Sequence, residues 1–414
     1  MRAEVRARLY ALAAWTTGVI LLAGCQTTSQ DGPIGRFGED LQFLKKYTDV
    51  IVLKDPDSAA RVAVVPGYQA RVMTSSANGR SGDSFGWLNR KQIAGREQQQ
   101  HINVFGGEDR FWLGPEGGQY SIFFRRGDPF QLEHWQTPDP IDWGGWDLAQ
   151  KHKRWAQFWK RMHLVNYHGT EFELLADRSI YVMSRTMIEQ LLGLELDAAL
   201  QVVAFESDNG ITNIGIEPWT KDGGLLSIWI LGMFNPTPTT TVVLPYAVGP
   251  SSRLGKTVVN DNYFGKVPAD RLKRANGVVY FKGDGQYRSK IGIPPGRAKP
   301  IIGSYDEELN LLTLVHYTLP EETVDYVNSR WKIQDDPYGG DVVNSYNDGP
   351  PKSGAAPLGP FYELETSSPA AALEPGQTLR HVHRTIHIQG DDSALDPIAR
   401  ATLGVGIDEI KNAF

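Results

Sequence analysis

Short segments rich in β-branched and aromatic residues recur along this chain of 414 residues, with turn-forming residues between them. Such residues favour strands, because branched and aromatic side chains pack well on a pleated surface. No fixed-period repeat and no low-complexity linker divides the chain after residue 38. The pattern predicts a mostly β protein built as one large antiparallel sandwich. The expected strands are Ala60–Val65, Tyr68–Met73, Tyr120–Phe124, Phe172–Met183, Leu200–Glu206, Leu225–Met233, Thr239–Leu244, Gly277–Phe281 and Leu311–Tyr317.

A few segments have the residue pattern of helices or turns instead. Residues 304–313 predict a hairpin, because a polar tip lies between alternating apolar residues. The expected helices are Asp40–Tyr47, Trp146–Met162, Arg185–Leu192 and an amphipathic tail over Asp392–Phe414. The predicted organisation is therefore a tether and short helix over 25–58, a β domain over 59–391 and a helical tail over 392–414.

The first residues have the pattern of an export signal. Three arginines within residues 1–8 precede an apolar run over 9–22, which is too short for a bilayer span of about 20 residues. The run ends in Leu22-Ala23-Gly24-Cys25, which resembles the bacterial lipobox. We expect residues 1–24 to be removed and the thiol of Cys25 to carry the lipid. An ordinary signal peptide, or a buried helix that happens to end in cysteine, is the alternative.

Two further observations bear on the predicted anchor. Cys25 is the only cysteine, so no disulfide can form within the chain, and a lone thiol beside an apolar run suits an acyl acceptor. Gln26 follows it, where an aspartate would act as an inner-membrane retention signal. The usual Gram-negative sorting rule then favours the outer membrane, with either its periplasmic or its surface face.

The charge balance excludes one class of partner. The net charge is −6 at pH 7, and no block of Lys or Arg occurs. Nucleic-acid binding needs a basic patch that contacts phosphates, so a nucleic-acid partner is not expected. The 11 Trp, 43 Gly and 25 Pro suit a turn-rich β architecture with aromatic surfaces.

Several motifs carry a family resemblance. Residues 361–369, 373–377 and 381–387 resemble the C-terminal end of the galactose-mutarotase-like superfamily, where a strand bearing Leu-Glu precedes a Pro-Gly turn and another strand. The chain is also similar to DUF6786, an uncharacterised bacterial family placed in that superfamily, over about residues 60–390. The segments that carry this similarity are Phe105–Gly118, Leu226–Phe234, Gly292–Tyr305 and Gly340–Gly349. The resemblance implies a β-supersandwich, a fold that hosts sugar epimerases, polysaccharide lyases, glycosidase domains and non-catalytic modules.

Glu365 is the first candidate for catalysis. The resemblance implies that this glutamate is a general base for a sugar hydroxyl, and burial in a cleft would raise its pKa toward the working pH. Strand alternation places Phe361, Glu363, Glu365 and Ser367 on one face, which indicates a polar cavity. A solvated sheet face is the alternative.

Three histidines share one face of the next expected strand: His381, His383 and His387. An imidazole beside a carboxylate makes an acid/base pair, and two imidazoles at this spacing can chelate zinc. We expect the Pro-Gly turn to bring this strand back beside Glu365. Satisfied structural histidines are the alternative.

Glycines surround a second group of candidates. Arg110, Trp112 and Glu116 lie within Gly106–Gly118, and the resemblance implies that this segment supplies an arginine and aromatics to a sugar site. Arg makes bidentate contacts with hydroxyls or carboxylates, and Trp stacks on the apolar face of a pyranose. The alternative is a strand–turn–strand in which Arg110 pairs with an acid.

Further polar candidates lie late in the chain. Asn347 and Asp348 fall in a turn-rich stretch whose oxygens suit a sugar or Ca²⁺, although EF-hand spacing is absent. His316 alternates with apolar neighbours, and a structural role competes there with sugar binding. Asn260 stands where mutarotases carry the histidine of a His-x-Tyr-Phe-Asn motif, which argues against simple aldose mutarotation.

These observations predict a lipid-anchored cell-envelope protein that binds a glycan in a concave β cleft. Acid/base chemistry of the epimerase, lyase or hydrolase type would rest on Glu365. A non-catalytic glycan-binding protein and a structural lipoprotein with a filled cleft are the alternatives. No cofactor is expected, with Ca²⁺ or Zn²⁺ as the metals to consider, and the sequence does not indicate an oligomeric state.

Overall fold

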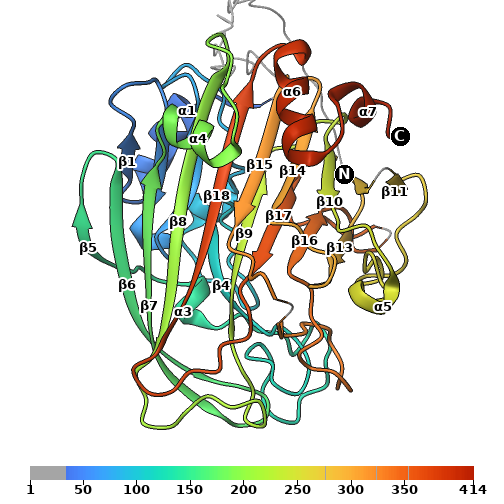
Figure 1. Ribbon diagram of the computed structural model, residues 1–414. Coiled ribbons are helices and arrows are strands. Elements are labelled where there is room, and N and C mark those ends of the chain that lie inside the picture. Colours follow the sequence, from blue (N-terminus) through green and yellow to red (C-terminus); the bar gives the residue numbers. More distant parts are fainter. Residues whose placement is uncertain (1–33, 276, 323, 353) are drawn as a thin grey trace, which may run out of the picture.

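The computed structural model describes residues 34–414 except 276, 323 and 353, and this part is built on three antiparallel sheets. The largest sheet has ten strands and runs across the whole molecule (Figure 1). Its order from edge to edge is β11 (Leu272–Ala275), β12 (Val278–Lys282), β10 (Thr241–Pro245), β14 (Ile301–Asp306), β15 (Leu311–Tyr317), β18 (Thr378–Gln389), β8 (Gln201–Asn213), β7 (Glu171–Val182), β6 (Trp155–Val165) and β5 (Asp147–Lys151).

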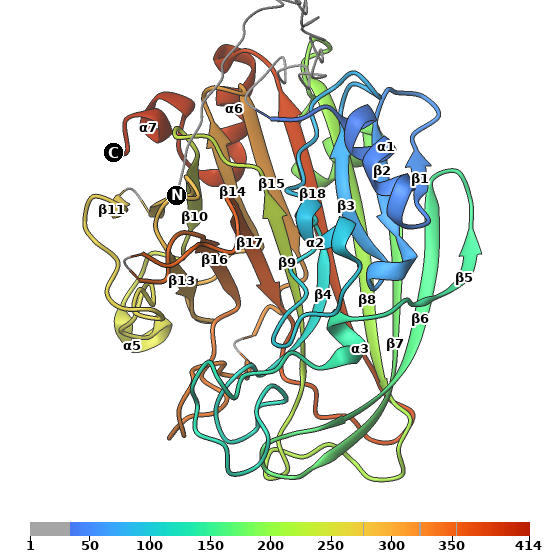
Figure 2. The same cartoon turned by 180° about the vertical axis from the view of Figure 1, so that it is seen from behind.

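Two smaller sheets accompany it. The five-stranded sheet has the order β13 (Ser289–Ile293), β16 (Val343–Asn347), β17 (Tyr362–Ser367), β9 (Ser227–Phe234) and β4 (Arg110–Gly114). The three-stranded sheet has the order β1 (Ile51–Lys54), β2 (Arg61–Val65) and β3 (Arg71–Ser76). Figure 2 shows the three-stranded sheet, with two short helices, on one face of the ten-stranded sheet.

The five-stranded sheet packs on the ten-stranded sheet through apolar side chains. Tyr362 and Leu364 of β17 and Phe234 of β9 share a buried cluster with Val242 of β10 and Val315 of β15. Burial on both faces explains why strands such as β9 and β13 lack a regular polar alternation.

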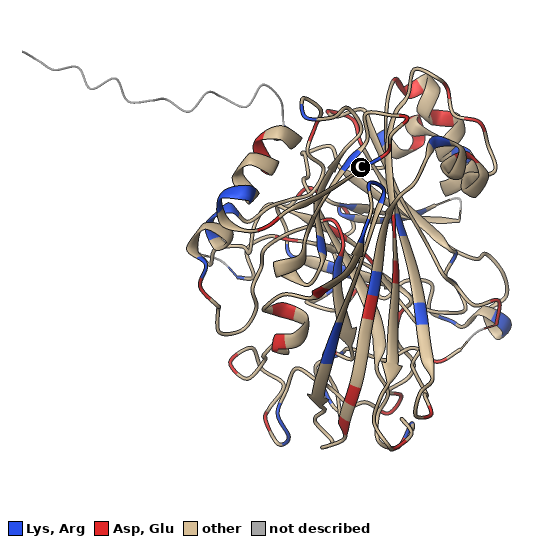
Figure 3. Ribbon diagram, turned by 90° about the vertical axis from the view of Figure 1, so that its left-hand side faces the viewer, with Lys and Arg blue, Asp and Glu red and all other residues tan. Residues whose placement is uncertain are grey.

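The other half of the ten-stranded sheet has one exposed face. Exposed or half-buried residues alternate with buried residues along β7, as expected for a strand with one face toward water. Figure 3 shows basic and acidic residues interspersed along the strands of this side of the molecule.

Seven short helices in the described part pack around the sheets. Their bounds are α1 (Phe37–Tyr47), α2 (Arg90–Gly95), α3 (Asp139–Asp142), α4 (Arg185–Leu192), α5 (Ser251–Leu254), α6 (Asp392–Leu403) and α7 (Ile407–Lys411), with a 3₁₀ turn at Pro66–Tyr68. Helices α4, α6 and α7 pack on the face of the ten-stranded sheet opposite the five-stranded sheet, through an apolar cluster (Figure 1). No helix in the described part is long and apolar enough to cross a membrane.

Much of the predicted secondary structure is confirmed. The mostly β class and the large antiparallel sheets are as expected. Six of the predicted strands coincide, within a few residues, with β2, β7, β9, β10, β12 and β15, a seventh covers the first half of β8, and the predicted hairpin is the β14–β15 turn. The predicted helices at Asp40–Tyr47, Arg185–Leu192 and the C-terminal tail correspond to α1, α4, α6 and α7.

Three expectations about local structure are wrong. Trp146–Met162 is not a helix but contains β5 and most of β6, in which Ala156, Phe158 and Met162 are buried at two-residue spacing. Tyr120–Phe124 forms no strand, and its apolar residues are buried because they pack into the main core as an irregular segment. Residues 68–73 begin as a turn, and the strand starts only at Arg71.

The predicted boundary at residue 58 also needs correction. β1 lies inside the range 25–58 and pairs with β2 beyond it, so its residues belong to the β domain and not to a tether. The predicted signal sequence and Cys25, the predicted site of the lipid, lie outside the described residues.

Candidate functional site

The outward face of the five-stranded sheet carries a row of polar side chains. Directly paired residues of neighbouring strands share a face, and Glu365 of β17 pairs with Asn344 of β16 and Leu231 of β9. Leu364 and Thr366, the neighbours of Glu365, point instead toward the ten-stranded sheet, because side chains alternate along a strand. Glu365 thus faces away from the sandwich core.

Glu365 is fully buried and ion-paired. Its Oε2 accepts hydrogen bonds from Lys290 Nζ at 2.7 Å and from Trp229 Nε1 at 2.9 Å. Lys290 Nζ also lies 4.6 Å from the centre of the Trp229 ring, a cation–π distance. The second carboxylate oxygen, Oε1, has no hydrogen-bond partner among the described residues.

Lys290 and Trp229 face a cavity of about 460 Å³, which we term the Lys290 cavity. This volume lies within the range of small-molecule sites. Its polar and aromatic lining includes Glu116, Trp229, Asn260, Tyr263, Arg288, Lys290, Arg330, Trp331, Asp341 and Asn344.

A second cavity of about 850 Å³ adjoins it, and we term it the Trp135 cavity after the indole in its wall. The two cavities share five lining residues: Glu116, Leu132, Phe264, Arg288 and Trp331. The two cavities therefore lie side by side, with these residues between them.

Glu116 lies where the two cavities meet. The loop after β4 carries it, and its backbone N–H donates to Ser329 Oγ at 3.1 Å, which joins this loop to the segment before β16. Burial raises the pKa of Glu116 to about 7; Lys290 lowers it, whereas the Glu365 carboxylate raises it further. A carboxyl group with this pKa can both give and take a proton near neutral pH.

A hydrogen-bonded network forms another part of the wall. Asp341 accepts hydrogen bonds from the Tyr263 hydroxyl and from Asn260 Nδ2, the latter at 2.7 Å, and Asn344 Nδ2 donates to the Tyr263 oxygen at 3.1 Å. Burial raises the pKa of Asp341, although these hydrogen bonds oppose the rise. Burial and the neighbouring Asp341 raise the pKa of Tyr263 well above its usual value. The network fixes the direction in which these polar groups point.

Arg110 and Trp112 lie deeper than expected. Arg110 Nη2 pairs with Glu363 Oε1 at 3.0 Å, and the guanidinium carbon lies 4.1 Å from the centre of the Trp112 ring. Trp112 packs in turn on Trp229, with ring centres 5.6 Å apart. Burial raises the pKa of Glu363 to about 8, while Arg110 opposes the rise. Neither Arg110 nor Trp112 lines either cavity, so they support the wall from behind.

The strand that carries His381, His383 and His387 is β18, and it does not lie beside Glu365 as the sequence predicted. β18 pairs with β15 and β8 in the ten-stranded sheet, whereas β17 pairs with β16 and β9 in the five-stranded sheet. The Pro-Gly turn therefore carries the chain from one layer of the sandwich to the other. The expected hairpin return beside Glu365 is wrong.

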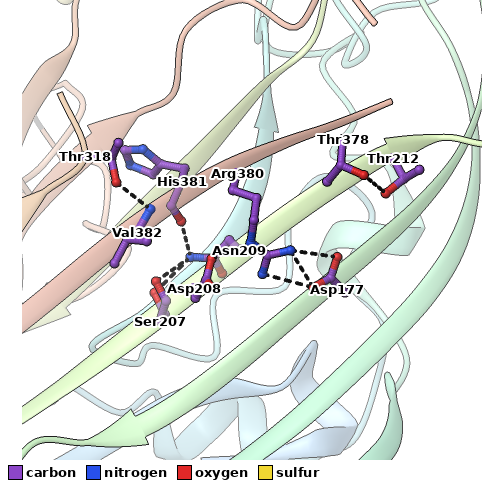
Figure 4. Close-up of polar contacts among 10 residues, drawn as sticks. All are labelled: Asp177, Ser207, Asp208, Asn209, Thr212, Thr318, Thr378, Arg380, His381 and Val382. Carbon is purple, nitrogen blue, oxygen red and sulfur yellow. Dashed lines mark hydrogen bonds and ion pairs between the residues drawn. The ribbon is translucent and has the colours of Figure 1, made fainter. Parts of the chain in front are cut away.

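His381 and His383 lie between the two layers, behind β17. His381 Nε2 and His383 Nδ1 are 2.8 and 2.9 Å from the hydroxyl of Thr366, on the opposite face from Glu365. Asn209 of β8 donates to the backbone carbonyl of His381 at 3.2 Å (Figure 4). Burial lowers the pKa of His381 to about 3 and that of His383 to about 4, so both are neutral at pH 7.

The other two histidines are also remote from the cavities. His387 is fully buried, with Nε2 2.9 Å from Glu108 Oε2 and Nδ1 2.9 Å from Thr313 Oγ1. His316 is half-buried on β15, where burial and the adjacent Arg384 lower its pKa to about 4. Neither histidine lines either cavity.

Asn347 and Asp348 differ in their positions. Asn347 ends β16, a regular strand where a turn-rich loop was expected, and its side chain accepts from the Gly285 N–H at 2.8 Å. Asp348 lines the Trp135 cavity and accepts from the Tyr346 hydroxyl at 2.6 Å. Among the described residues, no group of three His, Cys, Asp or Glu side chains is arranged to hold a metal ion.

The sequence reasoning missed four central residues: Trp229, Tyr263, Lys290 and Asp341. They come from β9, from β13 and from two irregular segments, and only the pairing of distant strands brings them together. One signal was present. Lys290 interrupts the apolar strand Ser289–Ile293, and a lysine at a buried strand position needs a partner.

Solved structures with a similar fold include three bacterial proteins. A Synechocystis protein shares 14% identity at a TM-score of 0.48, with 83% of this chain and 96% of that chain covered. A galactose mutarotase-like protein from Lactobacillus casei shares 10% identity at 0.47, with 82% and 100% covered. A galactose mutarotase related enzyme from Lactobacillus acidophilus shares 8% identity at 0.45, with 83% and 98% covered.

No curated protein is significantly similar in sequence. Residues 35–414 match the family described as a family of unknown function, DUF6786. This match covers nearly all of the described chain, and the protein belongs to the DUF6786 family.

Proposed function

We propose that this protein binds a carbohydrate in the Lys290 cavity and carries out proton transfer on it. The observation that carries the proposal is the position of Glu116, whose pKa of about 7 and place in the wall of a 460 Å³ cavity suit an acid/base group. Trp229, Tyr263 and Trp331 give this cavity aromatic surfaces, and aromatic rings stack on the apolar faces of sugars.

The proposed chemistry divides the work between two carboxyl groups. Glu365 is held as the partner of Lys290, and Glu116 exchanges a proton with a sugar oxygen or carbon. A pair of acids in different environments is a common arrangement for acid/base catalysis. Epimerase, lyase and hydrolase reactions all use such proton transfer, and we propose this class of reaction as a whole.

A non-catalytic glycan-binding protein is the second candidate. Phe264 and Trp331 in the shared wall of the two cavities favour it, because stacking surfaces are what such a protein needs. A structural lipoprotein would need a filled cleft, which two open cavities do not support.

The proposal includes attachment to a membrane. The sequence Leu22-Ala23-Gly24-Cys25 and the preceding apolar run support a lipid on Cys25. We propose that the protein is held at the bacterial cell envelope, with Gln26 favouring the outer membrane.

A glycan array and a reducing-sugar assay on the detergent-purified full chain test the function. We expect glycan binding by the wild type, and loss of turnover with retained binding in Glu116→Gln. Glu195→Gln, at an exposed position that lines neither cavity, is the matched control and should behave as wild type. Binding without turnover in the wild type would favour the second candidate, and absence of glycan binding would overturn both.

A further inference from the structure

Basic side chains are concentrated in the Lys290 cavity. Arg288, Lys290, Arg330 and Lys332 all line it, although the chain as a whole has a net charge of −6. Lys290 is the only one of the four with a carboxylate ion pair among the described residues. Arg288 lies over the Phe264 ring at 3.9 Å, and Arg330 Nη2 donates to Asn260 Oδ1 at 3.3 Å, so both of these partners are neutral.

The acids of this cavity do not offset these cations. Glu116 and Asp341 are its acidic lining residues. Asp341 accepts hydrogen bonds from Tyr263 and Asn260, and Glu365, which lies behind the wall, pairs with Lys290, so three carboxyl groups stand against four basic side chains. The cavity therefore carries an excess of positive charge at neutral pH.

The Trp135 cavity differs from the Lys290 cavity in the charge of its lining. Its lining pairs the basic Lys91 and Arg288 with the acidic Glu97, Glu116 and Asp348, so the charges nearly balance. Apolar surface comes from Trp135 and from Leu358, whose side chain is 50% exposed. Phe264, 45% exposed, stands in the wall shared with the Lys290 cavity.

We propose that the ligand is an anionic oligosaccharide, with an acidic sugar unit in the Lys290 cavity and neighbouring units in the Trp135 cavity. This inference rests on the proposed carbohydrate function and narrows it to a substrate class. A carboxylate or a sulfate ester on the sugar would meet Arg288, Arg330 and Lys332, which form charge-assisted hydrogen bonds with either group. A single ring would leave most of the two adjoining cavities empty, so a chain of several units fits them better.

Calorimetric titration of the detergent-purified full chain tests the charge preference. The probes are tetragalacturonate and its full methyl ester, together with a sulfated tetrasaccharide and the unsulfated form of the same backbone. We expect one acidic probe to bind at least about tenfold tighter than its neutral counterpart, as one or two charge-assisted hydrogen bonds predict. The preference should shrink as salt is raised, because screening weakens exposed charge pairs. Whichever acidic probe binds identifies the carboxylate or the sulfate.

Substitutions in the Lys290 cavity test whether its basic side chains cause the preference for acidic probes. Arg330→Gln and Lys332→Gln should reduce the acidic-over-neutral preference, whereas Arg161→Gln, at an exposed position of β6 away from both cavities, should leave it unchanged. Monomeric galacturonate should bind more weakly than the tetramer if several units are held.

The possible failures are distinguishable. Equal binding of acidic and neutral probes, or a preference untouched by the cavity variants, would overturn the anionic assignment and leave the carbohydrate function standing. Equal binding of monomer and tetramer would overturn the extended site. If none of the tested glycans binds here or on the array, the proposed function itself fails.

Discussion

Glu116 and Glu365 are two glutamates at one site whose surroundings differ. Glu365 is fully buried and has Lys290 at 2.7 Å, whereas Glu116 lies on a loop and its pKa is raised to about 7 by burial. The sequence favoured Glu365 as the base, because the resemblance places a Leu-Glu pair on a late strand. In the structure, Glu116 has the pKa that suits proton exchange near pH 7, although the sequence had indicated it only as a residue of the sugar-binding segment.

Glu116→Gln should stabilise the protein in a pH-dependent way. The folded state keeps the proton of Glu116 up to about pH 7, whereas an unfolded glutamate loses it near 4.5, so the burial of this group costs stability as pH rises between these values. Gln mimics the neutral acid, and its advantage should grow from pH 4.5 to 7 and reach roughly 3 kcal/mol. Thermal melts of Glu116→Gln and the Glu195→Gln control at several pH values measure it; a constant difference across this range would contradict the raised pKa.

Lys290→Met should be strongly destabilising. It leaves the fully buried Glu365 without its cation, and removing one partner of a buried ion pair costs about 3–5 kcal/mol. Adding Glu365→Leu should recover much of this loss. Lys266→Met is the control, because Lys266 is 74% exposed and its ion pair with Asp261 should contribute below about 1 kcal/mol. Denaturant unfolding measures the three variants and the wild type, and equal losses for Lys290→Met and Lys266→Met would show that the buried pair is unimportant.

At the scale of elements, composition predicted some strands correctly, and alternation would have predicted one more. The β-branched and aromatic residues of β7 and of the first half of β8 were enough to predict strands there. β6 was taken for a helix because Lys, Gln and Trp are frequent in it, yet its buried residues repeat every second position, which is the period of a strand.

The position of β18 shows what local sequence cannot settle. A Pro-Gly turn between two strands fits a hairpin, and it fits equally a crossing between two layers. Here β17 and β18 meet only through side chains such as Thr366 with His381 and His383. The choice depends on which distant strands each one pairs with, and no local pattern encodes that.

The buried histidines predict a loss of stability in mild acid. An unfolded imidazole takes up a proton near pH 6.5, but burial holds the pKa of His383 at about 4 in the folded state. The unfolded state thus binds more protons between these values, and stability falls as pH drops from about 6.5 to 4, by roughly 3 kcal/mol for this residue.

Urea unfolding at pH 7, 6, 5 and 4.5 tests this expectation. His383→Gln should lower stability at pH 7 but flatten the pH dependence. His163→Gln, in an exposed pair with Glu173 on β6, should not flatten it. The same pH dependence in the wild type and in His383→Gln would show that His383 titrates normally.

At the scale of the whole molecule, the site is a product of long-range topology. Glu116, Lys290 and Glu365 are far apart in sequence and meet because β4 and β13 are the two edges of a sheet with β17 inside it. The sequence could predict that polar residues line one face of a β sandwich. It could not predict which of the many acids and bases share that face, since this follows from strand order.

The proposed anchor would place the start of the described chain close to a membrane. Eight residues separate Cys25 from Ile34, the first described residue, and a chain of this length reaches at most about 30 Å.

Cys25→Ser should leave an unprocessed precursor that no longer partitions into the detergent phase, because the thiol is the atom that accepts the lipid. Ser29→Thr, four residues further along, is the control and should be processed and retained. Phase partitioning and the mass of the N-terminal peptide measure both effects. Normal processing and membrane retention of Cys25→Ser would rule out the lipid anchor, and glycan binding by the same variant would show that the cavity works without it.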